Sequence, residues 1–288
     1  MSIEALVSRQ NPDGGWPYLR GSSWTEPTVY AVMSLLAAGR ADAAARGLRW
    51  LAAAQRRDGG WPPQPSVDES AWVTGLVALL PPGRSLAPAA HAAAIRWLAG
   101  TVGRESTIEY RVREWLLGNP IPAEQDFIGW PWVPGAAAWV GPTSIAILAL
   151  DKEQRRRPSS ALDDRIASGR QFLLQRMCDG GGWNHGSARP LGYDSDPYPE
   201  TTGMALAALR GETSSKIGQA LAVARRFLAG CRSADALNWL RLGLLAHGGL
   251  PASFVCPAGI ACRTVPELSL GLLLESGDAA QRLFWEAA

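Results

Sequence analysis

Apolar residues follow two different patterns along this chain. In residues 47–54, Leu48, Leu51 and Ala52 recur at the i, i+3, i+4 spacing of one helix face, with the charged Arg49 between them. Four other apolar runs contain no charge at all, at residues 29–38, 71–80, 144–150 and 202–209. A helix that is apolar all round is buried on every side. The two patterns therefore predict amphipathic outer helices packed around buried inner helices.

A glycine-rich motif recurs between the two kinds of segment. Gln10-Asn-Pro-Asp-Gly-Gly-Trp16 returns as Gln55-Arg-Arg-Asp-Gly-Gly-Trp61, with insertions as Gln175 to Trp183, and in weaker form as Gln125 to Trp130. Asp-Gly-Gly ends an outer helix, because glycine adopts positive φ at no steric cost. A short loop follows, and oxygen-bearing side chains with proline then mark the start of each inner helix.

The C-terminal third contains weaker copies of the same unit. Residues 220–229 and 237–246 form another helix pair, and Val265-Pro266-Glu267 begins a last inner helix that runs to Leu274. No linker rich in proline or glycine divides the chain, so we expect one all-α domain over residues 1–288. Five to six stacked helix pairs can close into a ring of parallel inner helices. The charged stretch 154–160 is expected to be an exposed loop between repeats.

Composition excludes some classes of function. Lysine and arginine exceed aspartate and glutamate by only 28 − 26 = 2, which argues against nucleic acid as a partner. The abundance of alanine and arginine is typical of a GC-rich bacterial genome. The apolar runs are too short to span a bilayer, and we expect a cytoplasmic protein, with peripheral membrane contact left open. Its four cysteines are expected to be reduced, buried thiols, although Cys256 and Cys262 could also pair or bind metal.

The repeated Gln-x-x-Asp-Gly-Gly-Trp resembles the QW motif of the prenyltransferase and squalene-oxidocyclase repeat family. The resemblance extends from Gln10 to about Ala208, and residues 181–186 and 198–203 are also similar to short, single-domain bacterial members. It implies an α/α toroid and an isoprenoid ligand. We interpret the repeated glutamines and tryptophans as structural, since a glutamine can bond neighbouring backbone and a tryptophan buries a large surface between repeats.

Carboxylates gather at the expected N-termini of the inner helices, which would surround one mouth of such a toroid. The members of this loose ring are Glu26, Asp68, Glu69, Glu200 and Glu267. One interpretation is that they cap the helices and offset the helix dipoles. The other is that a dry cavity keeps one or two of them protonated, as a general acid requires.

One of these acids lies in a recognisable motif. Ser66-Val67-Asp68-Glu69-Ser70-Ala71 resembles the Asp-x-Asp-Asp-Thr-Ala motif of class II terpene cyclases, with Ser66 and Glu69 in place of the flanking aspartates. In that family the middle aspartate protonates an alkene or epoxide, which implies Asp68 as proton donor and Glu69 as its modulator. A catalytic Asp68 should face a closed apolar cavity of several hundred Å³. An ion-paired Asp68 on the rim of a filled barrel would argue against this role.

Aromatic residues lie near the same mouth and can stabilise a cation through the faces of their rings. With two of the carboxylates they form the expected substrate-binding set of Trp24, Glu26, Tyr30, Trp72, Trp139, Tyr198 and Glu200. Tyr30 follows Glu26 by four residues and Trp72 follows Glu69 by three, so each pair would share nearly one helix face.

Two classes of function follow from these residues. The first is a terpene-cyclase-like enzyme that acts on an isoprenoid, and the second is a non-catalytic toroid that binds an apolar ligand or a protein partner. We expect no cofactor and no metal, because no cysteine or histidine accompanies an acid where protein prenyltransferases hold zinc. Cation binding by Asp194 and Asp196 is left open. Polysaccharide hydrolases on α/α barrels also use two separated carboxylic acids, which this ring could supply.

Overall fold

Helices account for all the regular elements in the described part of the chain. The structure is a computed structural model that describes residues 2–118, 127–186, 195–251, 254–257 and 259–286. The elements are α1 (Ile3–Val7), α2 (Thr25–Ala37), α3 (Ala41–Ala54), α4 (Val73–Ala78), α5 (Pro88–Gly100), η1 (Arg104–Ser106), α6 (Ile108–Leu116), α7 (Val140–Arg156), α8 (Ser160–Gln175), α9 (Pro199–Ala208), α10 (Ser215–Gly230), α11 (Ala234–Ala246), α12 (Val265–Glu275) and α13 (Ala279–Trp285).

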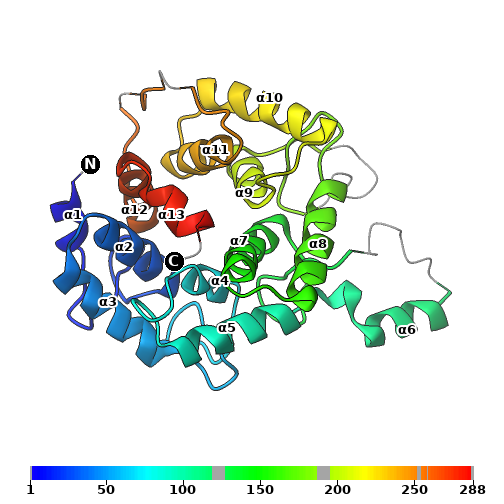
Figure 1. The fold of residues 1–288 in the computed structure, drawn as a ribbon, viewed down its shortest axis with the longest axis horizontal. Coiled ribbons are helices and arrows are strands. Elements are labelled where there is room, and N and C mark those ends of the chain that lie inside the picture. The colour runs from blue at the N-terminus through cyan, green and yellow to red at the C-terminus, as the bar shows by residue number, and fades with distance from the viewer. Residues whose placement is uncertain (1, 119–126, 187–194, 252–253, 258, 287–288) are drawn as a thin grey trace.

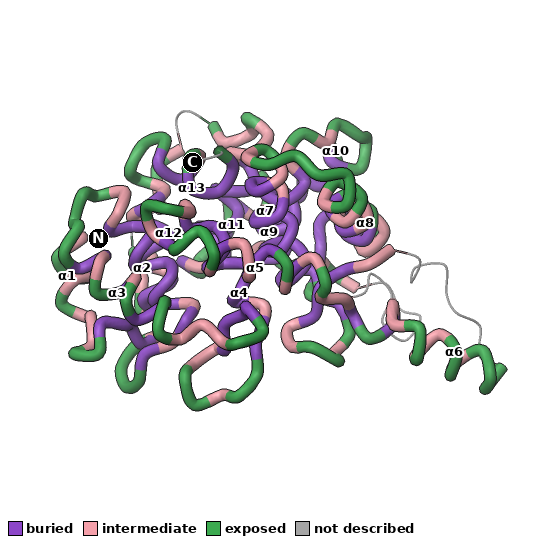
Figure 2. Tube along the Cα trace, turned by 60° about the horizontal axis from the view of Figure 1, so that its bottom comes forward, coloured by how far each residue is buried: buried purple, intermediate pink, exposed green. Residues whose placement is uncertain are grey.

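The helices form an α/α toroid, which confirms the predicted fold (Figure 1). Six inner helices follow one another around a closed ring in the order α2, α4, α7, α9, α11, α12, and α12 packs back against α2. Helices α3, α5, α8 and α10 lie outside them. The uncharged runs are buried as their pattern predicts, since every residue from Val140 to Leu150 of α7 is buried (Figure 2). That the whole chain is a single domain stays a prediction.

The tryptophans of the repeated motif connect one helix pair to the next. The indole N–H donates to a carbonyl at the end of the preceding helix, from Trp16 to Leu6 at 2.9 Å, from Trp61 to Leu51 at 2.7 Å and from Trp183 to Leu173 at 2.6 Å. In each copy the backbone N–H of the tryptophan donates to a threonine in the next inner helix, such as Thr28. These tryptophans are fully buried, so the structural interpretation is confirmed.

The glutamines of the motif also have a structural role. Gln10 Nε2 donates to the carbonyl of Gly14 in the glycine turn at 2.8 Å and to that of Ala43 in the next outer helix at 3.0 Å. Gln55 repeats the arrangement with Gly59 and Ala90, at 3.0 and 2.9 Å. One amide thus fixes the turn to the neighbouring repeat. Gln125 of the weak copy lies outside the described residues.

A C-terminal helix that the pattern analysis missed closes one end of the ring. Helix α13 lies over the C-terminal ends of the inner helices (Figure 1). Trp285 Nε1 donates to Ala207 O at 3.1 Å, and Lys152 Nζ donates to both Leu283 O and Leu79 O, at 2.8 and 2.9 Å. Helix α13 is held by hydrogen bonds to α7 and α9, and we call this the closed end.

The expectation of a loop over residues 154–160 is wrong for its first half. Helix α7 continues to Arg156, because its last turns are paired: Arg155 with Asp151, four residues earlier, and Arg156 with Glu153, three residues earlier. Arg155 also donates to Trp285 O at 2.7 Å. The basic run is therefore helical and helps to hold the closed end.

Aromatic side chains fill the middle of the ring. Tyr30 of α2 packs edge to face against Trp239 of α11 at 6.5 Å between ring centroids, and Trp239 packs against Phe284 of α13 at 6.3 Å. All three side chains are buried. The rings therefore link α2, α11 and α13 inside the ring.

Two features of the described residues complete the fold. No helix among them is long and apolar enough to cross a membrane. The four cysteines are free thiols, with Cys178 and Cys231 buried as expected, whereas Cys256 and Cys262 are only half-buried.

Candidate functional site

Four inner helices, adjacent around the ring, each carry one carboxylate in their first turn. We call this set the acidic arc, and its members are Glu26 of α2, Glu267 of α12, Asp235 of α11 and Glu200 of α9. Glycines bring two of these helices close together, because a Cβ on Gly203 of α9 would overlap the backbone of Trp239 in α11. The close approach of α9 and α11 places Glu200 beside Asp235.

Glu26 lies in a desolvated part of the arc. Burial raises the pKa of its carboxyl to about 7; the hydrogen bond that the Tyr18 hydroxyl donates to it lowers the pKa, and the nearby Asp235 raises it. Tyr30, one turn later on α2, is buried, and burial together with the neighbouring Glu26 raises its own pKa well above the usual range. A carboxylic acid near half-protonation at neutral pH, beside aromatic rings, can act as a general acid.

Asp235 was missed by the sequence analysis, which began its helix two residues later, at Leu237. Burial, followed by the charges of Glu200 and Glu267, raises the pKa of Asp235 to about 6. The available signal was Ser233, whose hydroxyl accepts a hydrogen bond from Ala236 N and caps α11. A helix that starts after Ser233 necessarily has Asp235 in its first turn.

Glu267 has the structural role that was one of the two interpretations. Its carboxylate accepts hydrogen bonds from the backbone N–H groups of Arg263 and Thr264, at 2.6 and 2.9 Å. Thr264 Oγ1 in turn accepts from Glu267 N, which completes a capping box. The functional interpretation therefore rests on the other members of the arc.

Asp68 and Glu69 lie apart from the acidic arc, in the exposed loop before α4. The side chain of Asp68 is 98% exposed and pairs with Arg56 at 2.5 Å. The expected shared face of Glu69 and Trp72 does not occur, because α4 begins only at Val73. Both acids face water rather than a dry cavity.

Aromatic residues occupy a distinctive position at the mouth. Four of the six inner helices have an aromatic N-cap residue, namely Trp24, Trp72, Trp139 and Tyr198. None of the four makes a side-chain capping bond, although serine, threonine, aspartate and asparagine are preferred there. All four were expected in the substrate-binding set. Their shared N-cap position brings them to one end of the toroid.

These aromatic residues differ in what they contact. Trp24 packs edge to face with Tyr18, the partner of Glu26, at 5.5 Å between centroids. Trp72 packs against Trp132 at 4.9 Å and is half-buried. Trp139 and Tyr198 are 37% and 47% exposed and contribute to the wall of a cavity.

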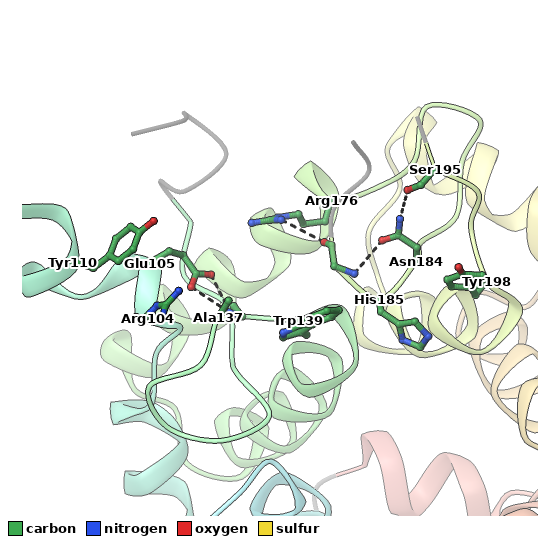
Figure 3. Close-up of a pocket in the computed structure, with 12 residues that line it drawn as sticks. Arg104, Glu105, Tyr110, Ala137, Trp139, Arg176, Asn184, His185, Ser195 and Tyr198 are labelled. Atoms are coloured by element: carbon green, nitrogen blue, oxygen red, sulfur yellow. Dashed lines mark hydrogen bonds between the residues drawn. The ribbon is translucent and has the colours of Figure 1, made fainter. Parts of the chain in front are cut away.

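That cavity has a volume of about 530 Å³, and Figure 3 shows the residues that line it. Its walls also include Arg104, Glu105, Tyr110, Ala137, Ala138, Arg176, Asn184, His185, Gly186 and Ser195. His185 connects the cavity with the arc, since its Nε2 lies 3.6 Å from Glu200 Oε1 and its ring 5.2 Å from that of Tyr198. Glu105 is buried and accepts a hydrogen bond from Ala138 N at 3.0 Å, a structural contact. The cavity is open and mixed in polarity rather than closed and apolar.

Metal binding finds little support in the described residues. They contain no group of three or more histidine, cysteine, aspartate or glutamate side chains that could hold a metal ion. Asp196 is exposed, and Asp194 lies outside the described residues. The carboxyl groups at the mouth could perform acid–base chemistry next to an aromatic cavity.

Comparison with known proteins identifies the fold. No family model matches the sequence, and no curated protein matches it. A GH76 α-mannanase from Bacteroides thetaiotaomicron has a TM-score of 0.62 and 9% identity, covering 97% of this chain and 95% of its own. A GH8 endo-β-1,4-glucanase from an Achatina fulica gut metagenomic library has a TM-score of 0.58 and 15% identity, covering 96% and 97%.

A type II terpene cyclase from Scytonema, in complex with geranylgeranyl dihydroxybenzoate, is similar as well. Its TM-score is 0.54 and its identity 18%, over 95% of this chain and 76% of the cyclase. All these identities are low, and the similar structures include both glycosidases and a cyclase. What they establish together is that this chain has the α/α toroid fold.

Proposed function

We propose that this chain is a short member of the prenyltransferase and squalene-oxidocyclase repeat family and a terpene-cyclase-like enzyme. An isoprenoid would bind along the aromatic mouth, with Trp139 and Tyr198 against its chain. Glu26 would donate the proton, and Asp235 would modulate its acidity. The observation that carries the proposal is the environment of Glu26, a carboxyl with a pKa raised to about 7 by burial, beside Tyr18 and Tyr30.

The assignment of the donor differs from the one that the motif resemblance implies. A proton donor to an alkene must be protonated at the working pH and shielded from water. The 98% exposed, ion-paired Asp68 lacks both conditions, whereas Glu26 approaches both. Asp68 and Glu69 are then loop residues outside the reaction.

The proposal is tested by product analysis. The protein is incubated with linear prenyl diphosphates and with squalene, and extracts are compared for wild type, Glu26→Gln and Asp68→Asn. We expect Glu26→Gln to lower the rate by about 10²–10⁴-fold, the usual contribution of a general acid, and Asp68→Asn to change it little. Activity should fall as the pH rises through about 7, because Glu26 then loses its proton. Products unaffected by Glu26→Gln would remove Glu26 from the mechanism.

The open cavity favours a second candidate, the hydrolysis of a glycosidic bond. Water reaches an open mouth and would quench a carbocation, whereas a glycosidase needs water together with two carboxyl groups. Exposed aromatic rings such as those of Trp139 and Tyr198 could line a sugar-binding surface. Release of reducing ends from β-glucan or α-mannan, abolished by Glu26→Gln or Asp235→Asn, would favour this candidate.

A non-catalytic toroid is the remaining outcome of the same experiments. If no substrate is turned over, binding of a prenyl diphosphate should still quench tryptophan fluorescence. Trp139→Ala should weaken that binding. Failure to bind either an isoprenoid or a glycan would leave a protein partner as the ligand.

A further inference from the structure

Helix α6 projects from the side of the toroid and leaves an apolar face uncovered. In both views it stands clear of the ring (Figures 1 and 2), and none of its nine residues is buried. Thr107 caps its N-terminus by accepting a hydrogen bond from Tyr110 N at 3.3 Å, so the helix has a regular start. The outer helices α3, α5, α8 and α10 each bury part of their surface against the inner helices. Helix α6 has a regular start but buries no residue.

The exposed apolar side chains of α6 form one stripe. Ile108, Val112, Trp115 and Leu116 recur at i, i+4, i+7 and i+8, which places them on a single helix face. Ile108 is 81% exposed, Trp115 is 74% exposed and Leu116 is 70% exposed. Four such neighbours amount to more than the single scattered apolar residues of an ordinary protein surface.

The other face of α6 is turned toward the protein. Tyr110 lines the cavity at the mouth, and the side chain of Glu114 is only 14% exposed. The helix therefore has a polar face, on which Tyr110 lines the cavity and Glu114 is largely covered, and on its opposite side an exposed apolar face.

Charges border the apolar stripe on both sides. On a helical projection Arg111 falls on one edge of the stripe, and Glu109 and Arg113 fall on the other. Arg104, in the adjoining η1, is exposed as well. Glu114 pairs with Arg113 at 3.5 Å. Apart from the buried Glu105, three basic side chains on η1 and α6 (Arg104, Arg111 and Arg113) outnumber two acidic ones (Glu109 and Glu114). This is the pattern of a helix that lies in the headgroup region of an anionic lipid surface.

The size of the stripe argues against a second protein chain as its main occupant. A standard protein interface takes about 20–30 residues from each partner and buries roughly 800 Å² on each. Four side chains on a nine-residue helix fall well short of this. A lipid surface needs no matching shape, and a tryptophan prefers the boundary between headgroups and acyl chains.

We propose that α6 is an interfacial helix that attaches this protein to an anionic lipid surface through Ile108, Val112, Trp115 and Leu116. The helix lies parallel to that surface with its apolar stripe among the headgroups. Tyr110, on its inner face, then holds the cavity mouth beside the membrane. The attachment is independent of which reaction the mouth performs.

The test is sedimentation of the full chain with vesicles. Phosphatidylcholine vesicles are compared with 3:1 phosphatidylcholine–phosphatidylglycerol vesicles, for wild type and for the double variant Trp115→Ser with Leu116→Ser. We expect binding several-fold tighter on the anionic vesicles and weakened by salt. The double variant should bind at least about tenfold more weakly, because it loses two of the four apolar side chains.

Val255→Ser is the matched control, since Val255 is an equally exposed apolar residue, at 81%, on a different loop. It should bind vesicles as the wild type does. Because all the substituted residues are exposed, urea unfolding should be unchanged for every variant, and Ile108→Ser gives a second measurement on the same stripe. Absence of vesicle binding by the wild type, or binding that the α6 variants leave intact, would overturn the proposal. So would a dimer in sedimentation equilibrium that the double variant dissociates, because the occupant would then be a second copy of the chain.

Discussion

The two ends of the toroid are built from the same inner helices but differ in how their charged side chains are paired. At the closed end, Lys152 and Arg155 each donate to carbonyl groups at the end of α13, so the cations are used to hold a helix in place. At the mouth, Glu26 and Asp235 have no basic partner among the described residues, and their nearest charges are other carboxylates.

This difference separates residues that stabilise the fold from residues that cost stability. A buried charge without a partner is destabilising unless it becomes neutral, and an aromatic N-cap forgoes a capping bond. At the mouth, Glu26 and Asp235 are desolvated without a basic partner among the described residues, and four inner helices begin with an aromatic N-cap. At the closed end, Lys152 donates to two carbonyl groups instead. Unfavourable groups that cluster at one end of an otherwise satisfied structure are typical of a functional site. The comparison makes predictions that differ in size and sign between the two ends.

The largest effect is expected at the closed end, from Trp285→Ala. This change creates a cavity and removes the hydrogen bond to Ala207 O, so we expect a loss of about 3–5 kcal/mol in the free energy of unfolding. Trp139→Ala at the mouth should cost less than about 1 kcal/mol, because that side chain is partly exposed. Urea denaturation of both variants measures the difference. Equal losses would contradict the distinction between the two ends.

Lys152→Met should cost about 2–4 kcal/mol, because it leaves the carbonyls of Leu79 and Leu283 without their donor. Burial lowers the pKa of Lys152 to about 8, against 10.5 for an ordinary lysine. Between these values the unfolded chain binds more protons, so the stability of the wild type should rise with pH from about 8 to 10.5. The variant should lack this rise. Thermal unfolding of the wild type and the variant between about pH 8 and 10.5 measures this difference. If stability changes with pH in the same way for both proteins, the amine of Lys152 is not buried as described.

Glu26→Gln should stabilise the protein at high pH, whereas Lys152→Met destabilises it. The folded-state pKa of Glu26 is about 7 and its ordinary value is 4.5, so wild-type stability falls as pH rises from about 4.5 through 7. The variant escapes this loss, and we expect a gain on the order of 1–3 kcal/mol at pH 8 but little at pH 5. Asp68→Asn is the control, because an exposed ion pair contributes roughly 0–1 kcal/mol. If the Glu26→Gln variant is less stable than the wild type at pH 8, ionised Glu26 does not destabilise the mouth as proposed.

The smallest effect concerns the helix caps. The backbone at Tyr198 has φ −107° and ψ 147°, which suits a serine N-cap. We expect Tyr198→Ser to stabilise α9 by up to about 1 kcal/mol while weakening ligand binding. Ser233→Ala, at the hydroxyl-capped α11, should instead cost about 1 kcal/mol. Differential scanning calorimetry distinguishes the expected gain in stability from the expected loss. A loss of stability in both variants would show that Tyr198 is a structural residue.

The architecture was readable from the sequence because it is repetitive. The copies ending at Trp16, Trp61 and Trp183 make the same two hydrogen bonds, so each copy reports the same local requirement. Helix α13 was not readable, because it is a single short helix with no counterpart in the repeat. The end of α7 was misjudged because a run of arginines has the composition of a solvated loop. In the structure, Arg155 pairs with Asp151 and Arg156 with Glu153, and Arg155 also donates to Trp285 O.

The candidate site could be read in part. The aromatic residues and Glu26 and Glu200 were found because they directly precede or begin uncharged runs, a pattern that lies within a few residues of sequence. Asp235 was missed because the start of its helix was placed at Leu237, three residues after the observed start at Ala234. Asp68 was singled out by a motif, yet a motif does not determine burial, and its carboxyl is exposed.

The sequence by itself determined the helix pairs, their joints and the end of the ring at which the carboxylates lie, because these depend on periodicity and on contacts within one repeat. Only the tertiary structure decided which carboxyl is buried, which is ion-paired and which faces another acid. Those properties arise where helices distant in the chain meet, as α2 meets α12 and α9 meets α11. The pKa of Glu26 depends on that meeting, since desolvation and neighbouring charge act through space rather than along the chain.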